Sequence, residues 1–294
     1  MTQSKYDGCL YICRKNNKLM LLVVYVDDIL FSSSDEKWTQ EFKVKLNKYF
    51  QIKDLGKANY CLGLEIKQNS EEITIGQTEY INDVLERFNM DKCKPVKTPI
   101  EKNLQFDHHK GVNEQKLHEG HKYQELIGSL MYLATSTRPD IMFAVNFLSQ
   151  FNNKNDERHW TAGKRVLRYL QGTKDVVLKY KNNKKPLEGF VDADWGQCTQ
   201  DRRSYTGYTF ILSCGAISAQ ELARNPVHHA KTKHIDIRFH LIREAVQNKT
   251  IDLHYKSEEL MADVMTKGLT GPAHYKCIDK FGLTNAGLRG GVGT

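Results

Sequence analysis

The chain has 294 residues, a formal net charge of +8 and a pI near 9.0. This length can bury a substantial core and holds one or two domains. The excess of Lys and Arg favours nucleic acid as a partner over a membrane surface, because no strongly basic amphipathic helix stands out. The seven cysteines have no CxxC spacing and the N-terminus has no apolar signal segment. These features argue against a disulfide framework and secretion, so we expect an intracellular protein, cytoplasmic or nuclear.

The stretch LLVVYVDDILFSSSD, which begins at Leu21, places two adjacent carboxylates inside a run of strand-forming residues. Eight consecutive apolar residues, 19–26, predict a buried strand, and strand, turn and strand together cover roughly 18–33. Two like charges in an apolar setting repel each other and lose hydration. Asp27 and Asp28 are tolerable at a hairpin turn in water, or where they share a cation.

The next segments alternate between helix and strand. Residues 35–50 predict an amphipathic helix with Asp35 as N-cap and one apolar face, formed by Trp38, Phe42, Leu46 and Tyr49. Short strands are expected around 59–66 and 72–77. A second helix over 78–90 carries Ile81, Val84, Leu85 and Phe88 at helical spacing. This order predicts an α+β fold with helices packed on an antiparallel sheet.

The character of the chain changes twice after residue 90. Residues 91–121 are polar and contain Pro95 and Pro99, so they are interpreted as a linker. Three helices follow over 123–136, 139–151 and 156–172; Pro139 opens the second and Gly172 closes the third. Strands are predicted at 176–181, 187–192 and 206–213, in one sheet, before further helical and strand segments after residue 234.

Two readings compete for Asp27 and Asp28. Adjacent carboxylates at a tight turn can bridge the divalent ions that nucleotidyl transfer uses, and Mg²⁺ (or Mn²⁺) prefers carboxylate oxygens. The alternative is an exposed hairpin turn, in which Asp is common, and composition alone favours it.

The stretch 154–185 is rich in Lys and Arg with interleaved aromatic residues. Lys164, Arg165 and Arg168 form a one-sided basic face that either contacts a phosphate backbone or is a solvated helix face. Zinc ligation is conceivable for four histidines without cysteine partners, His108, His109, His118 and His121, but their segment has no zinc-site pattern. A second histidine group, His228, His229 and His234, is interpreted as structural or solvent-facing.

The YVDD hairpin resembles the palm hairpin of reverse transcriptases, and the whole chain resembles the C-terminal part of the Pol polyprotein of copia-type (Ty1/copia, Pseudoviridae) retrotransposons. The matching blocks occur in family order: SKYDGCLYI, LLVVYVDDILFSSSD, KDLGKANYCLGLEI, YQELIGSLMYLATSTRPDI, HWTAGKRVLRYLQGT, GFVDADW, DRRSYTGYTFIL, ELARNPVHHAKTKHIDIRFHLIRE and LRGG.

The resemblance implies a domain order and a set of site residues. Residues 1–90 correspond to the late palm and the region after it, 91–121 to a linker, 122–172 to the helical connection, and 176–294 to a ribonuclease H-like α/β module. Asp27 and Asp28 match two of the polymerase's three metal-binding carboxylates, and Tyr25 and Val26 match positions near the primer terminus. In the ribonuclease H-like part, Asp192 (with Asp194 as the alternative) and Asp263 match metal-binding carboxylates. Implied partners are an RNA template, a DNA primer or an RNA–DNA hybrid, with Mg²⁺ or Mn²⁺ and nucleotides, and no membrane.

The chain also departs from the family pattern. The third polymerase carboxylate of the family lies upstream of the residues present here. In the ribonuclease H-like part, Ser218-Ala219-Gln220 runs almost directly into Glu221, where the family has a helix and a strand that carry the two middle carboxylates. These departures predict an internal deletion near residue 220, an incomplete module with an unpaired sheet edge, and weak metal binding. The chain is identified as a fragment of a reverse transcriptase with a ribonuclease H remnant, inactive by itself; the alternative is a repurposed non-catalytic nucleic-acid-binding protein.

Overall fold

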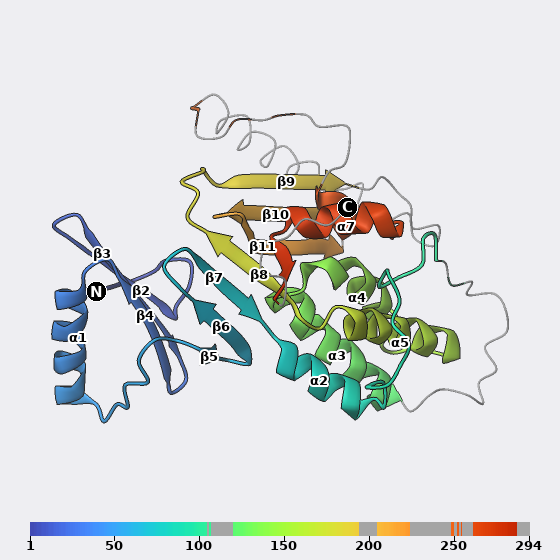
Figure 1. The fold of residues 1–294 in the computed structure, drawn as a ribbon, viewed down its shortest axis with the longest axis horizontal. Helices are drawn as coiled ribbons and strands as arrows, with labels where there is room; N and C mark the ends of the chain where they lie inside the picture. Colours follow the sequence, from blue (N-terminus) through green and yellow to red (C-terminus); the bar gives the residue numbers. More distant parts are fainter. Residues whose placement is uncertain are drawn as a thin grey trace, which may run out of the picture. The chain divides into compact units, whose positions relative to one another are not determined.

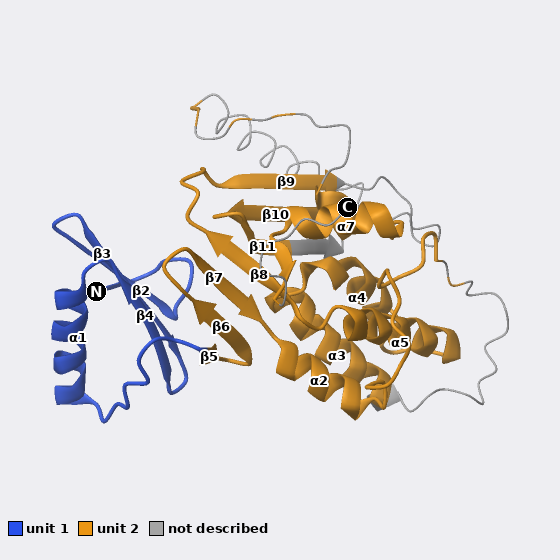
Figure 2. Ribbon diagram, in the orientation of Figure 1, with its two compact units in different colours: residues 1–59 blue, residues 60–294 orange. Residues whose placement is uncertain are grey.

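The structure is a computed structural model. It describes residues 1–104, 106, 120–193, 205–223, 248, 249, 252, 254 and 261–286. The chain divides into two compact units, residues 1–59 and 60–294 (Figure 2). This division by contacts differs from the domain boundary near residue 90 that the resemblance implies, and that boundary stays a prediction.

The first unit is an antiparallel sheet followed by one helix (Figure 1). Its strands pair in chain order and are β1 (Thr2–Gln3), β2 (Leu10–Lys15), β3 (Lys18–Tyr25) and β4 (Asp28–Ser33). Helix α1 (Glu36–Tyr49) begins after Asp35, whose carboxylate accepts a hydrogen bond from the Trp38 backbone N–H at 2.8 Å. The predicted hairpin and the predicted N-cap are therefore confirmed.

The first unit buries few apolar side chains. Only Met20 and Leu22 of β3 are buried, and α1 has no buried residue. Leu22 lies opposite Phe31 in the β3–β4 register, and the Phe31 ring lies 5.8 Å from the ring of Phe42 in α1, so this face of the sheet is the one that α1 covers. The prediction of a buried strand holds for one face of β3 only, because the pleat turns alternate side chains, such as the exposed Val23, to the other face. Tyr49, expected on the covered face of α1, is 81% exposed.

The second unit contains a helical layer and a sheet whose strands come from distant parts of the sequence (Figure 1). The sheet has the order β12-β8-β7-β6-β5, with β5 (Tyr60–Cys61), β6 (Leu64–Gln68), β7 (Glu72–Gly76), β8 (Val176–Lys181) and β12 (Leu283–Asn285). Strand β8 was expected to share a sheet with the strands at 187–192 and 206–213. That expectation is wrong, since β8 pairs with β7 and β12 through registers such as Ile75 opposite Leu178.

The helices of this unit enclose the main core. They are α2 (Thr78–Arg87), α3 (Gly120–Ser136), the short 3₁₀ helix η2 (Pro139–Ile141), α4 (Met142–Ser149), α5 (Glu157–Gly172) and α7 (Gly271–Lys280). The apolar positions predicted for α2 are confirmed, because Ile81, Val84 and Leu85 are buried and Phe88 packs against the same core. Among the described residues, no helix is long and apolar enough to cross a bilayer.

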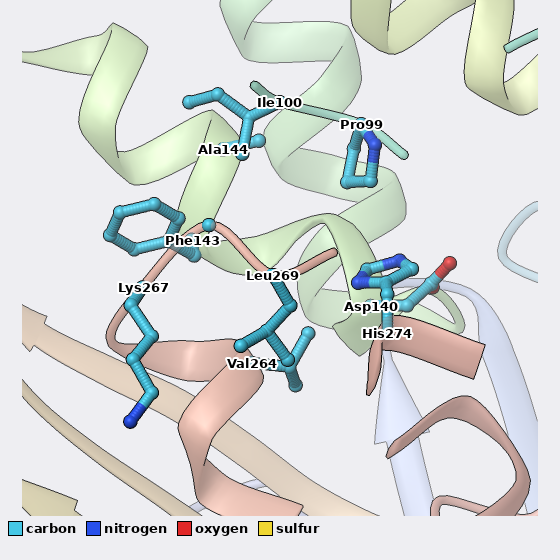
Figure 3. Close-up of a pocket in the computed structure, with 10 residues that line it drawn as sticks. Pro99, Ile100, Asp140, Phe143, Ala144, Val264, Lys267, Leu269 and His274 are labelled. Carbon is cyan, nitrogen blue, oxygen red and sulfur yellow. The ribbon is translucent and has the colours of Figure 1, made fainter. Parts of the chain in front are cut away.

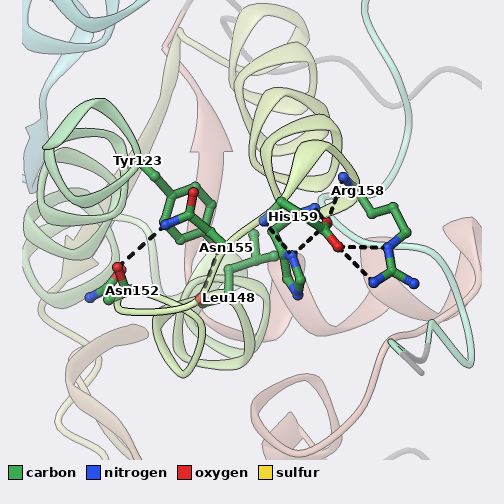
Figure 4. A network of polar contacts seen from close by, with 7 residues as sticks. Tyr123, Leu148, Asn152, Asn155, Arg158 and His159 are labelled. Atoms are coloured by element: carbon green, nitrogen blue, oxygen red, sulfur yellow. Dashed lines mark hydrogen bonds and ion pairs between the residues drawn. The ribbon is translucent and has the colours of Figure 1, made fainter. Parts of the chain in front are cut away.

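Helix α5 begins with a reciprocal cap (Figure 4). The Asp156 carboxylate accepts hydrogen bonds from the backbone N–H groups of Arg158 and His159, and the Asp156 N–H donates to the His159 ring at 3.0 Å. The Tyr123 hydroxyl of α3 donates to the Leu148 carbonyl of α4 at 2.8 Å nearby. The cap bonds fix the start of α5, and the Tyr123 bond joins α3 to α4.

A separate antiparallel sheet has the order β11-β10-β9, with β9 (Glu188–Ala193), β10 (Tyr205–Leu212) and β11 (Gly215–Ala223). The 3₁₀ helix η3 (Met261–Met265) packs closely on β10. The space between them admits only glycine at position 207, where an added Cβ atom would lie 2.4 Å from the Cβ of Met265. Within the described residues the outer edge of β9 has no strand partner.

Candidate active site and nucleic-acid interface

The YVDD residues form the tip of the β3–β4 hairpin. Tyr25 and Asp28 are the last paired residues, so Val26 and Asp27 are the two central residues of the turn. Val26 has a φ of 53°, the left-handed conformation that primed hairpin turns require at their first central residue. A β-branched residue adopts this conformation only with strain, and such strain is typical of functional sites.

The tip is open to solvent. Tyr25 is 54% exposed and Val26 87% exposed, and both aspartates belong to the exposed class. Because the carboxylates lie in water, their mutual repulsion is small, on the order of 1 kcal/mol at about 4 Å. The structure therefore agrees with a hairpin turn in water, and the apolar sequence around the pair does not bury it.

The donor set at the tip does not complete a metal site. In the parts of the chain that the structure describes, no group of three or more His, Cys, Asp or Glu side chains could hold a metal ion. Mg²⁺ requires near-octahedral oxygen coordination and keeps several waters when few protein ligands are supplied. Asp27 and Asp28 alone therefore fit only a weak, largely hydrated ion.

The two carboxylates predicted in the C-terminal part lie on neighbouring elements. Asp192 is on β9 and Asp263 is on η3. Thr266 links them, because its hydroxyl donates to Asp192 Oδ2 at 2.5 Å and also lies 3.3 Å from the backbone carbonyl of Asp263. Thr266 was missed from the sequence, although its position three residues after Asp263 places it on the same side of one helical turn.

A cation already neutralises one of these carboxylates. The Lys267 Nζ lies 3.1 Å from Asp263 Oδ1, so a divalent ion at Asp263 would have to displace an ammonium group. Both predicted carboxylates therefore make contacts within the protein, Asp192 with Thr266 and Asp263 with Lys267. The role of Asp192 and Asp263 as metal ligands stays a prediction.

The other acidic residues and histidines that were singled out in the sequence fall outside what the structure describes in full. Asp194, His108, His109, His118, His228, His229 and His234 are outside the described residues, and for His121 and Glu221 the structure describes only the backbone. The backbone of Glu221 continues β11 and lies opposite Gly207 in β10, so the proposed deletion junction falls inside one continuous strand.

The three basic residues predicted to contact nucleic acid lie on α5 and are half-buried. The Arg165 guanidinium donates to Glu101 Oε1 at 3.0 Å and to Thr98 Oγ1 at 3.2 Å, and Arg168 Nε donates to the Lys94 carbonyl at 2.8 Å. The Lys164 ammonium lies 5.3 Å from the centre of the Trp160 ring. All three side chains therefore make contacts within the protein.

A buried polar network lies behind α5. Arg138 and Asp140 pair directly, Tyr169 donates to the Asp140 carboxylate at 2.6 Å, and the His274 ring nitrogen lies 3.2 Å from the Tyr169 hydroxyl. Burial lowers the pKa of His274, which favours the neutral ring at this position. Sequence patterns did not single out this network, because its members come from η2, α5 and α7.

A small pocket with a cavity volume of about 10 Å³ adjoins the network (Figure 3). Asp140 and His274 lie at one side and Lys267 and Phe143 at the other, with Leu269 and Val264 between them. Its lining joins segments that are far apart in the sequence, so the pocket marks where residues 99 and 100 pack against the C-terminal part.

Comparisons with known proteins identify the family of the chain. Residues 2–102 match the family described as reverse transcriptase (RNA-dependent DNA polymerase). The chain is 33% identical to the retrovirus-related Pol polyprotein from transposon TNT 1-94 of Nicotiana tabacum, over 89% of this chain and 24% of that protein. It is 31% identical to the Pol polyprotein from transposon RE2 of Arabidopsis thaliana, over 94% of this chain and 23% of that protein. No solved structure matches the chain.

A shorter relative matches over most of its own length. It is an uncharacterized mitochondrial protein of Arabidopsis thaliana, 35% identical over 73% of this chain and 88% of that protein. These matches place the chain in the reverse transcriptase class. The chain belongs to the family of copia-type retrotransposon Pol polyproteins, and it spans about a quarter of the length of the Pol polyproteins that it matches.

Proposed function

We propose that this chain is a retrotransposon reverse transcriptase fragment that binds nucleic acid but performs neither DNA synthesis nor RNA hydrolysis by itself. The observation that carries the proposal is the hairpin tip, where Asp27 and Asp28 are presented to solvent without a third carboxylate among the described residues. In-line phosphoryl transfer depends on holding metal ions and phosphates in place, and two adjacent carboxylates hold neither firmly.

The C-terminal carboxylates support the second half of the proposal. Asp192 accepts a hydrogen bond from Thr266, and Asp263 pairs with Lys267. A ribonuclease H-type reaction needs these oxygens for two metal ions. We infer a ribonuclease H remnant whose carboxylates now stabilise the contact between η3 and the sheet.

An internal deletion explains the missing ligands. The match with the tobacco protein runs over 321 positions, whereas 89% of this 294-residue chain is about 262 residues, so some tens of positions have no counterpart here. The junction expected at Gln220 and Glu221 lies within β11. Because β11 continues across Gln220 and Glu221, we infer that the fold tolerates the deletion.

We infer that Asp27 and Asp28 bind a divalent ion only weakly, and paramagnetic broadening of backbone NMR signals with Mn²⁺ tests this. We expect weak, selective broadening at residues 25–28, because both carboxylates are exposed and adjacent. Asp27→Asn should abolish it, and Glu41→Gln, an exposed charge change on α1, should leave it unchanged. Broadening that survives in Asp27→Asn would show that the ion binds elsewhere.

The nuclease part is tested by incubating the chain with a labelled RNA–DNA hybrid and Mg²⁺ or Mn²⁺. We expect no cleavage of the RNA strand. Cleavage by the wild-type chain that disappears in Asp192→Asn would contradict the proposal, since it would show that Asp192 still binds a catalytic ion.

A further inference from the structure

Residues 91–104, here called the strap, lie along α5. Three α5 side chains hold the strap backbone or its side chains: Gln171 donates to the Asp91 carbonyl at 2.8 Å, Arg168 to the Lys94 carbonyl, and Arg165 to Thr98 and Glu101. The donors recur every three residues and therefore lie on one face of the helix. Because their partners occur in the reverse order, the strap runs antiparallel to α5.

Apolar contacts fix the strap as well. Ile100 is 5% exposed and belongs to the main core, and Thr98 and Pro99 are also buried. Pro95 packs against Gly172, where an added Cβ atom would lie 3.0 Å from the Pro95 Cβ. This part of the predicted linker is thus held on the helical layer by both polar and apolar contacts.

The outward side of the strap is basic. It presents four exposed lysines: Lys92, Lys94, Lys97 and Lys102. Among the described residues, none of them has a carboxylate within ion-pair distance. Of the two acidic residues in the strap, Asp91 and Glu101, the second is already paired with Arg165. The strap therefore carries uncompensated positive charge on a backbone that is fixed in place.

We propose that the strap is the phosphate-contacting surface of this chain, and that Arg165 and Arg168 position it instead of contacting phosphate themselves. The inference rests on the proposed nucleic-acid binding and deepens it. Lysine ammonium groups contact phosphodiesters as point charges without reading sequence, and each contact releases counterions. A backbone that is already ordered loses less conformational entropy when a strand binds.

The test compares two matched variants of the full chain. The strap variant carries Lys92→Gln, Lys94→Gln, Lys97→Gln and Lys102→Gln. The control variant carries four changes at exposed lysines of the same unit that lie outside both the strap and the basic stretch 154–185: Lys67→Gln, Lys249→Gln, Lys276→Gln and Lys280→Gln. Both lose the same charge. Fluorescence anisotropy with a labelled single-stranded oligonucleotide over a KCl series gives the affinity and its salt dependence.

We expect the strap variant to bind at least tenfold more weakly than wild type at low salt. Its slope of log affinity against log salt should be shallower by about three, at about 0.7 for each lost contact on a single strand. The control variant should keep most of the wild-type slope. Circular dichroism should show the same helix content in all three proteins, because the changed side chains are exposed.

Three results would overturn the inference. If the strap variant keeps the wild-type slope, the strap does not contact phosphate. The proposed nucleic-acid binding would then stand, and another surface would carry it. A wild-type chain that binds no oligonucleotide would overturn both the inference and the proposed nucleic-acid binding. Displacement of the oligonucleotide by poly-glutamate as effectively as by unlabelled oligonucleotide, at equal charge, would show a surface for acidic polypeptides.

Discussion

Arg138 and Asp140 form a bidentate ion pair with both side chains fully shielded from solvent, in which Nε and one terminal nitrogen of Arg138 lie 2.9 and 2.7 Å from the two carboxylate oxygens. Burial alone would raise the pKa of Asp140, but the guanidinium opposes this and the pKa is lowered overall. Arg138 also donates to the Thr173 carbonyl at 2.9 Å, beyond the end of α5. The pair therefore links η2 to α5 within the buried network.

Removal of one partner of this pair should be costly. We expect Asp140→Asn to lower the free energy of unfolding of the second unit by about 3–5 kcal/mol, because it leaves a buried guanidinium without its counter-charge. The double change Arg138→Met and Asp140→Leu should cost less than the sum of the two single changes. Urea unfolding followed by circular dichroism measures both. Additive effects would show that the two side chains do not stabilise each other.

His274 predicts a pH dependence of stability. Burial lowers its pKa below the ordinary value near 6.5, so the unfolded chain takes up a proton at this ring before the folded chain does. Stability from neutral His274 is therefore complete above about pH 6.5 and is lost as the pH falls toward the folded pKa, by at most about 1.4 kcal/mol per pH unit. His274→Gln should reduce this slope between pH 7 and 5.5. An equal slope in wild type and variant would contradict the assignment.

The first unit should be much less protected than the second. Its buried apolar side chains are Met20 and Leu22, whereas α3 alone contributes four leucine and isoleucine side chains to the main core, Leu126, Ile127, Leu130 and Leu133. Regions with few buried apolar contacts open with low free energy. In native-state hydrogen exchange we expect the amides of β3 to exchange at least tenfold faster than those of Leu126–Leu133. Equal protection in both segments would contradict this.

The turn strain at Val26 can be measured directly. A left-handed backbone costs an L-residue roughly 1–2 kcal/mol, and glycine avoids this cost but is more flexible in the unfolded chain by roughly 0.5–1 kcal/mol. We therefore expect Val26→Gly to stabilise the first unit slightly, by up to about 1 kcal/mol. Val26→Ile, which keeps the β-branch, should give no gain. Destabilisation by the glycine would mean that the Val26 conformation is not strained.

Local signals predicted the local structure well. The Asp35 cap, the β3–β4 turn and the apolar face of α2 follow from short-range rules, and the structure confirms them. Short-range rules could not predict the pairing of β8 with β7, because it joins residues about a hundred positions apart. Neither strand's sequence indicates which strand it pairs with. Burial in β3 was overestimated, since an apolar run does not say how many faces of a sheet are covered.

At the candidate sites, too, the sequence predicted local features but not long-range contacts. The sequence locates charge, as at Arg165 and Arg168, but does not reveal that the donors of these side chains are directed to the strap. It places Asp263 on a C-terminal helical element but does not reveal that Lys267 neutralises it. Whether a charged group is available for a ligand depends on tertiary contacts, and composition and spacing do not contain that information.

We propose that the exposed Asp27-Asp28 tip does not form a working polymerase site in this chain. Primer extension on a primed RNA template, with nucleotides and Mg²⁺ or Mn²⁺, tests it most directly, with Asp27→Asn as the matched control. We expect the wild-type chain to extend the primer no more than the Asp27→Asn variant does. Template-directed extension by the wild-type chain that disappears in Asp27→Asn would contradict the account, because it would show that this chain builds a complete site around the hairpin.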